Sequence, residues 1–90
     1  MIVDDDQPLR SIMIDFINKF NSPIIEFEEA IDGLMGLNIF SKRNESINSN
    51  NIDLIFSDIQ MPNLNGYEMV ENINKMNTHV MPEIIVLSSN

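Results

Sequence analysis

The sequence contains no cysteine, one histidine and only five basic residues in a length of 90. Without cysteine there are no disulfide bridges or thiolate metal sites, and one histidine is too few for an ordinary zinc site. No apolar run approaches the roughly 20 residues needed to cross a bilayer. No basic-then-apolar signal opens the chain either. We therefore expect a cytoplasmic location and no direct membrane contact.

The shortage of basic residues leaves a net charge of −9, from 14 acidic and 5 basic side chains. Most of such a surface would repel a nucleic acid, so we expect no direct nucleic-acid partner. Divalent cations and basic or neutral protein surfaces are the expected partners. Net charge alone also serves solubility, so the positions of the acids are more informative. With 43% hydrophobic residues the chain can form a packed core, and its length allows one domain.

The apolar and polar patterns predict strands that alternate with helices. The strands are expected at 1–3, 24–27, 52–56 and 84–87, and the helices at 8–20, at 31–41 and after Gly66. Asp6 is a candidate cap for the first helix. The polar, asparagine-rich stretch at 41–51 is expected to be a mobile loop. Alternating strands and helices imply a parallel sheet with right-handed crossovers.

Acidic or hydroxyl side chains follow three of the predicted strands: Asp4–Asp6, Asp58, and Ser88 with Ser89. The carboxyl ends of parallel strands share one edge of a sheet, and this edge is where such folds bind ligands. Two carboxylates about 5 Å apart repel by roughly 3 kcal/mol at an effective dielectric of 20. A cluster of them therefore raises its pKa values or recruits a cation. Oxygen-only ligands favour Mg²⁺.

Such a site suits phosphoryl chemistry, because a bound cation neutralises phosphoryl oxygens and a neighbouring aspartate is a competent nucleophile. Ser88 could donate a hydrogen bond to a phosphoryl oxygen. A plainer interpretation is that the acids merely cap the next helix. We favour the plainer interpretation for Asp6, and the metal and phosphoryl site for Asp4, Asp5 and Asp58 together.

Four segments, in order along the chain, resemble the response-regulator receiver domain. They are Val3-Asp4-Asp5, Ala30-Ile31-Asp32-Gly33, Asp58-Ile59-Gln60-Met61-Pro62 followed by Gly66, and Val86-Leu87-Ser88-Ser89. The resemblance implies a flavodoxin-like α/β fold with a parallel sheet and alternating helices. It also implies two-component or phosphorelay signalling, with a histidine kinase or a histidine phosphotransfer protein as partner. A longer chain could carry an output domain or belong to a membrane-anchored hybrid kinase.

Carried over residue by residue, the resemblance assigns roles to five side chains or carbonyls. Asp58 would accept the phosphoryl group, and Ser88 would bond that group and couple it to a conformational switch. Asp5 and Asp58 would ligate Mg²⁺ directly, Asp4 through water, and Gln60 through its backbone carbonyl. The resemblance therefore implies a regulatory module and not an enzyme. A Mg²⁺-dependent aspartyl-phosphate phosphatase would need a second aspartate at position 60, where this chain has Gln60.

The chain departs from the receiver pattern at its end, since the family's last strand and last helices have no counterpart in it. The family's lysine, which pairs with the phosphoryl group, belongs to that part. We expect Lys75 to lie on the third helix, where it cannot replace that lysine. The aromatic switch residue of the family's last strand is also missing, since Tyr67 lies elsewhere. The domain at 1–90 is therefore interpreted as a partial receiver, a fragment in preference to a natural short form. A phosphorylation-dead interaction module is the alternative function, and the uncovered fourth strand is expected to allow self-association.

Overall fold

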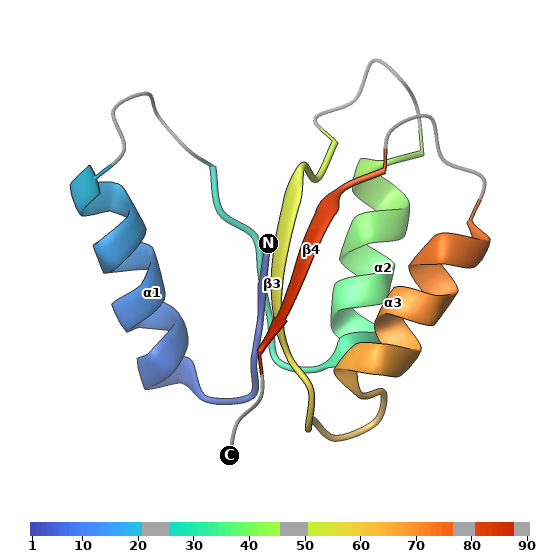
Figure 1. The fold of residues 1–90 in the computed structure, drawn as a ribbon, viewed down its shortest axis with the longest axis horizontal. Coiled ribbons are helices and arrows are strands. Elements are labelled where there is room, and N and C mark those ends of the chain that lie inside the picture. Colours follow the sequence, from blue (N-terminus) through green and yellow to red (C-terminus); the bar gives the residue numbers. More distant parts are fainter. Residues whose placement is uncertain (21–25, 46–50, 77–80, 88–90) are drawn as a thin grey trace.

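The computed structural model describes residues 1–20, 26–45, 51–76 and 81–87. Four parallel strands form one sheet in the order β2-β1-β3-β4. Helix α1 lies on one side of this sheet, and α2 and α3 lie together on the other (Figure 1). The elements are β1 (Ile2–Val3), α1 (Gln7–Phe20), β2 (Glu29–Ala30), α2 (Gly33–Arg43), β3 (Leu54–Asp58), α3 (Gly66–Lys75) and β4 (Glu83–Leu87). The predicted parallel α/β arrangement is thus confirmed.

Strand β1 is short but central, because it pairs with β2 on one side and with β3 on the other. Its register places Ile2 beside Phe56 and Val3 beside Ser57. The β3–β4 pair runs over five residues, from Leu54 beside Glu83 to Asp58 beside Leu87. All four strands run in the same direction, so their carboxyl ends meet at one edge, which is the lower edge in Figure 1.

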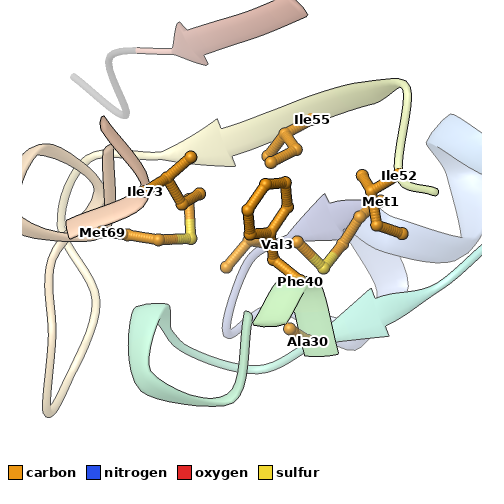
Figure 2. Close-up of a cluster of buried hydrophobic side chains, with 8 residues drawn as sticks. All are labelled: Met1, Val3, Ala30, Phe40, Ile52, Ile55, Met69 and Ile73. Atoms are coloured by element: carbon orange, nitrogen blue, oxygen red, sulfur yellow. The ribbon is translucent and has the colours of Figure 1, made fainter. Parts of the chain in front are cut away.

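The hydrophobic core lies between the sheet and the α2–α3 pair. Helix α2 contributes Phe40, and α3 contributes Met69 and Ile73 (Figure 2). The remaining core residues are Met1, Val3, Ala30, Ile52 and Ile55. Gly36 permits this close packing, because an added methyl group would meet Met69 Sδ at 2.9 Å and Val3 Cγ2 at 3.2 Å.

The opposite side of the sheet, on which α1 lies, is more open. Four apolar residues of α1 are exposed: Leu9, Ile12, Phe16 and Phe20. The less exposed positions of α1 are Arg10, Met13, Ile14 and Ile17, spaced as one face of a helix. On the sheet, Leu54, Ile85 and Leu87 are also exposed. Strand alternation places them away from the core. None of the helices in the described ranges is long and apolar enough to span a membrane.

Several predicted boundaries need correction. The second strand is Glu29–Ala30, not 24–27; of the predicted range, 26–27 is not strand and 24–25 lies outside the described residues. Pairing decides this position, since Ile2 and Val3 find their partners at Glu29 and Ala30. The expected loop at 41–51 begins later, because α2 continues to Arg43; residues 46–50 lie outside the described residues. Strand β3 extends through Asp58.

Candidate functional site

Strand pairing brings Asp4 and Asp58 together. Val3 of β1 lies beside Ser57 of β3 in a parallel register. The residues that follow them, Asp4 and Asp58, therefore lie beside each other at the carboxyl edge of the sheet. Asp5 follows Asp4 in the loop to α1, at the same sheet edge. Each of these three aspartates offers a carboxylate oxygen, and the three oxygens lie within 4.8 Å of one another. Segments more than 50 positions apart thus form one acidic cluster of Asp4, Asp5 and Asp58.

The three carboxylates differ in solvent exposure. Asp4 is 8% exposed, Asp58 is half-buried and Asp5 is exposed. Burial raises the pKa of the Asp4 carboxyl above its ordinary value, and the charges of Asp58, Asp5 and Asp6 raise it further. The backbone amide of Asp6, which donates to Asp4 Oδ1 at 2.9 Å, acts against these effects. The cluster therefore has an unfavourable concentration of negative charge, which a bound cation would relieve.

Asp58 is held by the backbone of the loop that follows it. The Ile59 amide donates to Asp58 Oδ1 at 2.8 Å and orients the carboxylate. The Gly66 amide donates to the Ile59 carbonyl at 2.8 Å and closes the loop. Gly66 is required here, because a side-chain carbon at this position would overlap the Asp58 carbonyl oxygen. The loop ends in a capping box, in which Asn65 and Glu68 bond each other's backbone amides.

The same loop is fastened to the start of α2. Asn63 adopts a left-handed backbone conformation, with φ of 68°, and its Nδ2 donates to Asp32 Oδ2 at 2.6 Å. Asp32 also caps α2 by accepting the Met35 amide at 2.8 Å. The Gly33 amide donates to the Leu64 carbonyl at 2.9 Å. Two neighbouring loops at the carboxyl edge are thus joined by two hydrogen bonds.

Asp32 has an electrostatic environment opposite to that of Asp4. The Met35 amide and the Asn63 side chain both stabilise the charged form, so they lower the pKa of Asp32 despite its burial. Asp32 thus accepts a hydrogen bond from a protein group at each of its two carboxylate oxygens. The acidic cluster has fewer protein donors and more repulsion, and this distinguishes a structural acid from a candidate ligand site.

The other residues named in the sequence analysis lie outside the acidic cluster or outside the described part of the chain. Ser88, the predicted phosphoryl hydrogen-bond donor, lies outside the described residues. Gln60 is exposed in the loop after Asp58, and Asp6 accepts the Leu9 amide at 3.2 Å, as expected of a helix cap. Lys75 lies on α3, where it pairs with Glu71 at 3.3 Å, and Tyr67 is exposed on the same helix. Lys75 therefore lies on the helix where it was predicted.

The sequence reasoning missed Arg10 as part of this region. Its Nη1 donates to the Asp4 carbonyl at 2.6 Å, and its Nε bonds Glu29 Oε1 at 3.1 Å. The available signal was its spacing with Met13, Ile14 and Ile17, which places it on the inward face of the helix. The Asn63–Asp32 bond was also missed, and nothing in the local pattern of either loop indicates it.

The chemistry of the acidic cluster fits a small divalent cation. It offers oxygen atoms only, from carboxylates that converge from a strand end, a loop and a second strand end. Hard cations such as Mg²⁺ prefer carboxylate and carbonyl oxygen and keep water in the remaining positions. The exposure of Asp5 leaves the cluster open to water.

Comparison with known proteins agrees with this geometry. The family described as "Response regulator receiver domain" matches residues 1–90. The sensor histidine kinase RcsC of Escherichia coli K12 is 31% identical over 77 residues, which are 84% of this chain and 7% of RcsC. RcsC of Salmonella typhimurium is 31% identical over the same length. The chain thus spans only a small part of the length of these relatives.

Two solved structures share the fold. The receiver domain of the histidine kinase CKI1 from Arabidopsis thaliana, solved as a mutant, has a TM-score of 0.83 and 26% identity, covering 99% of this chain and 64% of that one. The N-terminal domain of an uncharacterized protein from Wolinella succinogenes has a TM-score of 0.73 and 30% identity, and the match covers 99% of this chain and 62% of that one. The flavodoxin-like fold is thereby confirmed. The chain belongs to the response regulator receiver domain family.

Proposed function

We propose that this chain is the phosphoryl-accepting module of a two-component or phosphorelay system, with Asp58 as the acceptor. The observation that carries the proposal is the convergence of Asp4, Asp5 and Asp58 at the carboxyl edge, within 4.8 Å of one another. A half-buried aspartate beside two further acids is suited to attack a phosphoryl group when a bound cation balances the negative charge of the cluster. The family membership supports the same assignment.

In this proposal Mg²⁺ is the cofactor. Asp5 and Asp58 would hold it directly, Asp4 through water, and Gln60 through its backbone carbonyl. When bound, the cation neutralises charge on the acidic cluster and on the incoming phosphoryl group. The raised pKa of Asp4 supports this, since burial and the neighbouring charges both disfavour its anionic form in the absence of a cation.

The chemical step is a transfer from a phosphohistidine donor. A carboxylate oxygen of Asp58 attacks phosphorus, the bond from phosphorus to the histidine nitrogen breaks, and an acyl phosphate forms. The Ile59 amide, which bonds Asp58 Oδ1 at 2.8 Å, orients the nucleophile for this attack. The hydroxyl of Ser88 would then bond the phosphoryl group and couple the reaction to a conformational change.

The partner in this proposal is a histidine kinase or a histidine phosphotransfer protein. RcsC is a sensor histidine kinase, and the matched segment is 7% of the length of RcsC. The match favours a receiver that works within or beside such a kinase. The module itself is regulatory and not an enzyme. The surplus of acidic residues favours a basic or neutral partner surface and disfavours direct contact with nucleic acid.

Acetyl phosphate tests the assignment without a known kinase. With Mg²⁺ present, the unmodified chain should gain one phosphate that hydroxylamine removes, and intact-mass measurement should detect it. Asp58→Asn should abolish the gain because the amide is not a nucleophile. Asp32→Asn is the matched control, since it removes an acid at the same edge that is already bonded to Met35 and Asn63. Labelling that survives in Asp58→Asn would refute the assignment.

A further inference from the structure

Arg10 is a buried cation beside the acidic cluster, at the end of the first turn of α1. It is 8% exposed, although arginine stays charged at all ordinary pH values. Burying a guanidinium is costly unless its donors find partners. Arg10 has two: Nη1 donates to the Asp4 carbonyl at 2.6 Å, and Nε donates to Glu29 Oε1 at 3.1 Å. Its position is therefore tightly specified.

These contacts form part of a closed ring. The Asp4 amide donates to the Ala30 carbonyl at 3.0 Å, and Ala30 follows Glu29 in β2. Glu29 holds Arg10, and Arg10 returns to the Asp4 carbonyl. The ring thus fixes Asp4 at its amide and at its carbonyl. That carbonyl belongs to the peptide group between Asp4 and Asp5, so its orientation determines the direction in which Asp5 leaves the strand.

We infer that Arg10 is a positioning residue for the acidic cluster, anchored by Glu29. Arg10 acts through the Asp4 main chain, since its hydrogen bond is to the carbonyl oxygen and not to the carboxylate. It holds the turn that presents Asp4 and Asp5 to the carboxylate of Asp58. This role rests on the proposed function, because it concerns the arrangement of ligands for Mg²⁺.

The alternative is that Arg10 only attaches α1 to the sheet. A purely structural contact would change stability, but it would not change the Mg²⁺ affinity of the molecules that remain folded. The test is therefore a titration with Mg²⁺ under conditions where each variant is folded. The Kd is measured from the NMR shifts of backbone amides in ¹⁵N-labelled protein. Removal of groups that orient metal ligands typically weakens metal affinity by about 10- to 100-fold.

Arg10→Ala should raise the Kd for Mg²⁺ about tenfold or more. Arg10→Lys keeps the charge but cannot bridge both partners, so its Kd should lie between those of Arg10→Ala and the unmodified chain. The lysine variant also serves if the alanine variant fails to fold. Arg43→Ala is the matched control, since it removes the same side chain from an ion pair with the exposed Glu26 and should leave the Kd unchanged. In metal-free samples, Arg10→Lys should shift the Asp5 and Asp6 amides.

An unchanged Kd in both Arg10 variants would overturn the inference and leave Asp58 as the proposed acceptor. Equal losses in Arg10→Ala and Arg43→Ala would also overturn it, because they would reflect a general effect of removing an arginine side chain and not the contacts of Arg10. If the unmodified chain itself binds no Mg²⁺, both the inference and the metal site of the proposed function are wrong. The titration therefore distinguishes failure of the positioning role from failure of the site.

Discussion

The two faces of the sheet differ in how completely the chain covers them. On the α2–α3 side, Phe40, Ile55, Met69 and Ile73 are fully buried in one cluster. On the α1 side, no large apolar residue of the helix is fully buried, and Ile85 and Leu87 of β4 are exposed. Figure 1 shows the same contrast, with α2 and α3 together on one side and α1 alone on the other. The chain thus builds one complete core and leaves a second face open.

The acidic cluster belongs to the open face by strand alternation. In β3, Leu54, Phe56 and Asp58 share one side of the strand, while Ile55 and Ser57 face the core. The site is therefore supported from behind by a packed core and reached from the less covered side. Mutations on the packed face should mainly change stability. Mutations on the open face should mainly change association and binding.

The largest expected difference between the faces concerns the oligomeric state. An edge strand with exposed apolar side chains invites pairing with a second chain, so we expect residues 1–90 to self-associate. Ile85→Lys places a charge on the open face and should shift the sample toward monomer in sedimentation velocity runs at several concentrations. Met35→Lys is the control, because Met35 is equally exposed, at 42% against 43% for Ile85, but lies on α2. Equal effects of the two changes would contradict the comparison.

Stability should follow the packed face. Phe40→Ala should lower the free energy of unfolding by about 3–5 kcal/mol, because it leaves a cavity in the complete core. Phe16→Ala should cost less than about 1 kcal/mol, since Phe16 is 64% exposed and Phe40 is fully buried. Urea denaturation of monomeric samples measures both. Similar losses would show that α1 is more closely packed than the structure indicates.

Gly33 sharpens the comparison at the carboxyl edge. A side-chain carbon at Gly33 would overlap the Leu64 carbonyl, which moves only with the loop after Asp58. Gly33→Ala should therefore cost about 1–3 kcal/mol, as overpacked sites do. Gly36→Ala should cost less, because its nearest obstacle is the flexible end of Met69. The order of the two unfolding free energies is the decisive result, and the reverse order would refute the packing argument.

The smallest effect concerns the cap of α2. Asp32→Ala should lower the free energy of unfolding by about 1 kcal/mol, through loss of the bonds to Met35 and Asn63. Asp32→Asn keeps a capping oxygen and isolates the effect of charge. A lowered pKa in the folded state means that ionised Asp32 stabilises the fold. That contribution is complete above the unfolded pKa of about 3.9 and is lost as the pH falls through the folded pKa.

Acid titration of stability checks the sign of this effect. The advantage of the unmodified chain over Asp32→Asn should be constant near neutral pH and should shrink below about pH 4. An advantage that grows on acidification would mean that the pKa of Asp32 is raised and not lowered.

The sequence was sufficient for the alternating order of elements and for the four residue segments that mark the family. Asp4, Asp5 and Asp58 could be grouped because each follows or ends an apolar strand, and parallel strands bring such ends together. The position of β2 could not be found from local pattern, because it depends on pairing with Ile2 and Val3. The bonds of Arg10 and Asn63 likewise depend on tertiary contacts between segments at least six positions apart.

The orientation of α1 could be predicted only in part. The spacing of its apolar residues was sufficient for the helix itself. Of these residues, Met13 and Ile17 are half-buried, whereas Leu9, Ile12, Phe16 and Phe20 are exposed. The inward position of Arg10 goes with its bonds to Asp4 and Glu29, which the local pattern does not indicate.

The most direct test of the central claim, that Asp4, Asp5 and Asp58 form a cation site, is the free energy of unfolding in urea as Mg²⁺ is raised. Binding to the folded state alone should add about 1.4 kcal/mol when Mg²⁺ reaches tenfold its Kd. Without Mg²⁺, Asp5→Asn should be more stable than the unmodified chain, because repulsion among the carboxylates is relieved. When Mg²⁺ is added, this variant should not gain the stabilisation that the unmodified chain gains. Identical unfolding free energies with and without Mg²⁺ in the unmodified chain would contradict the account.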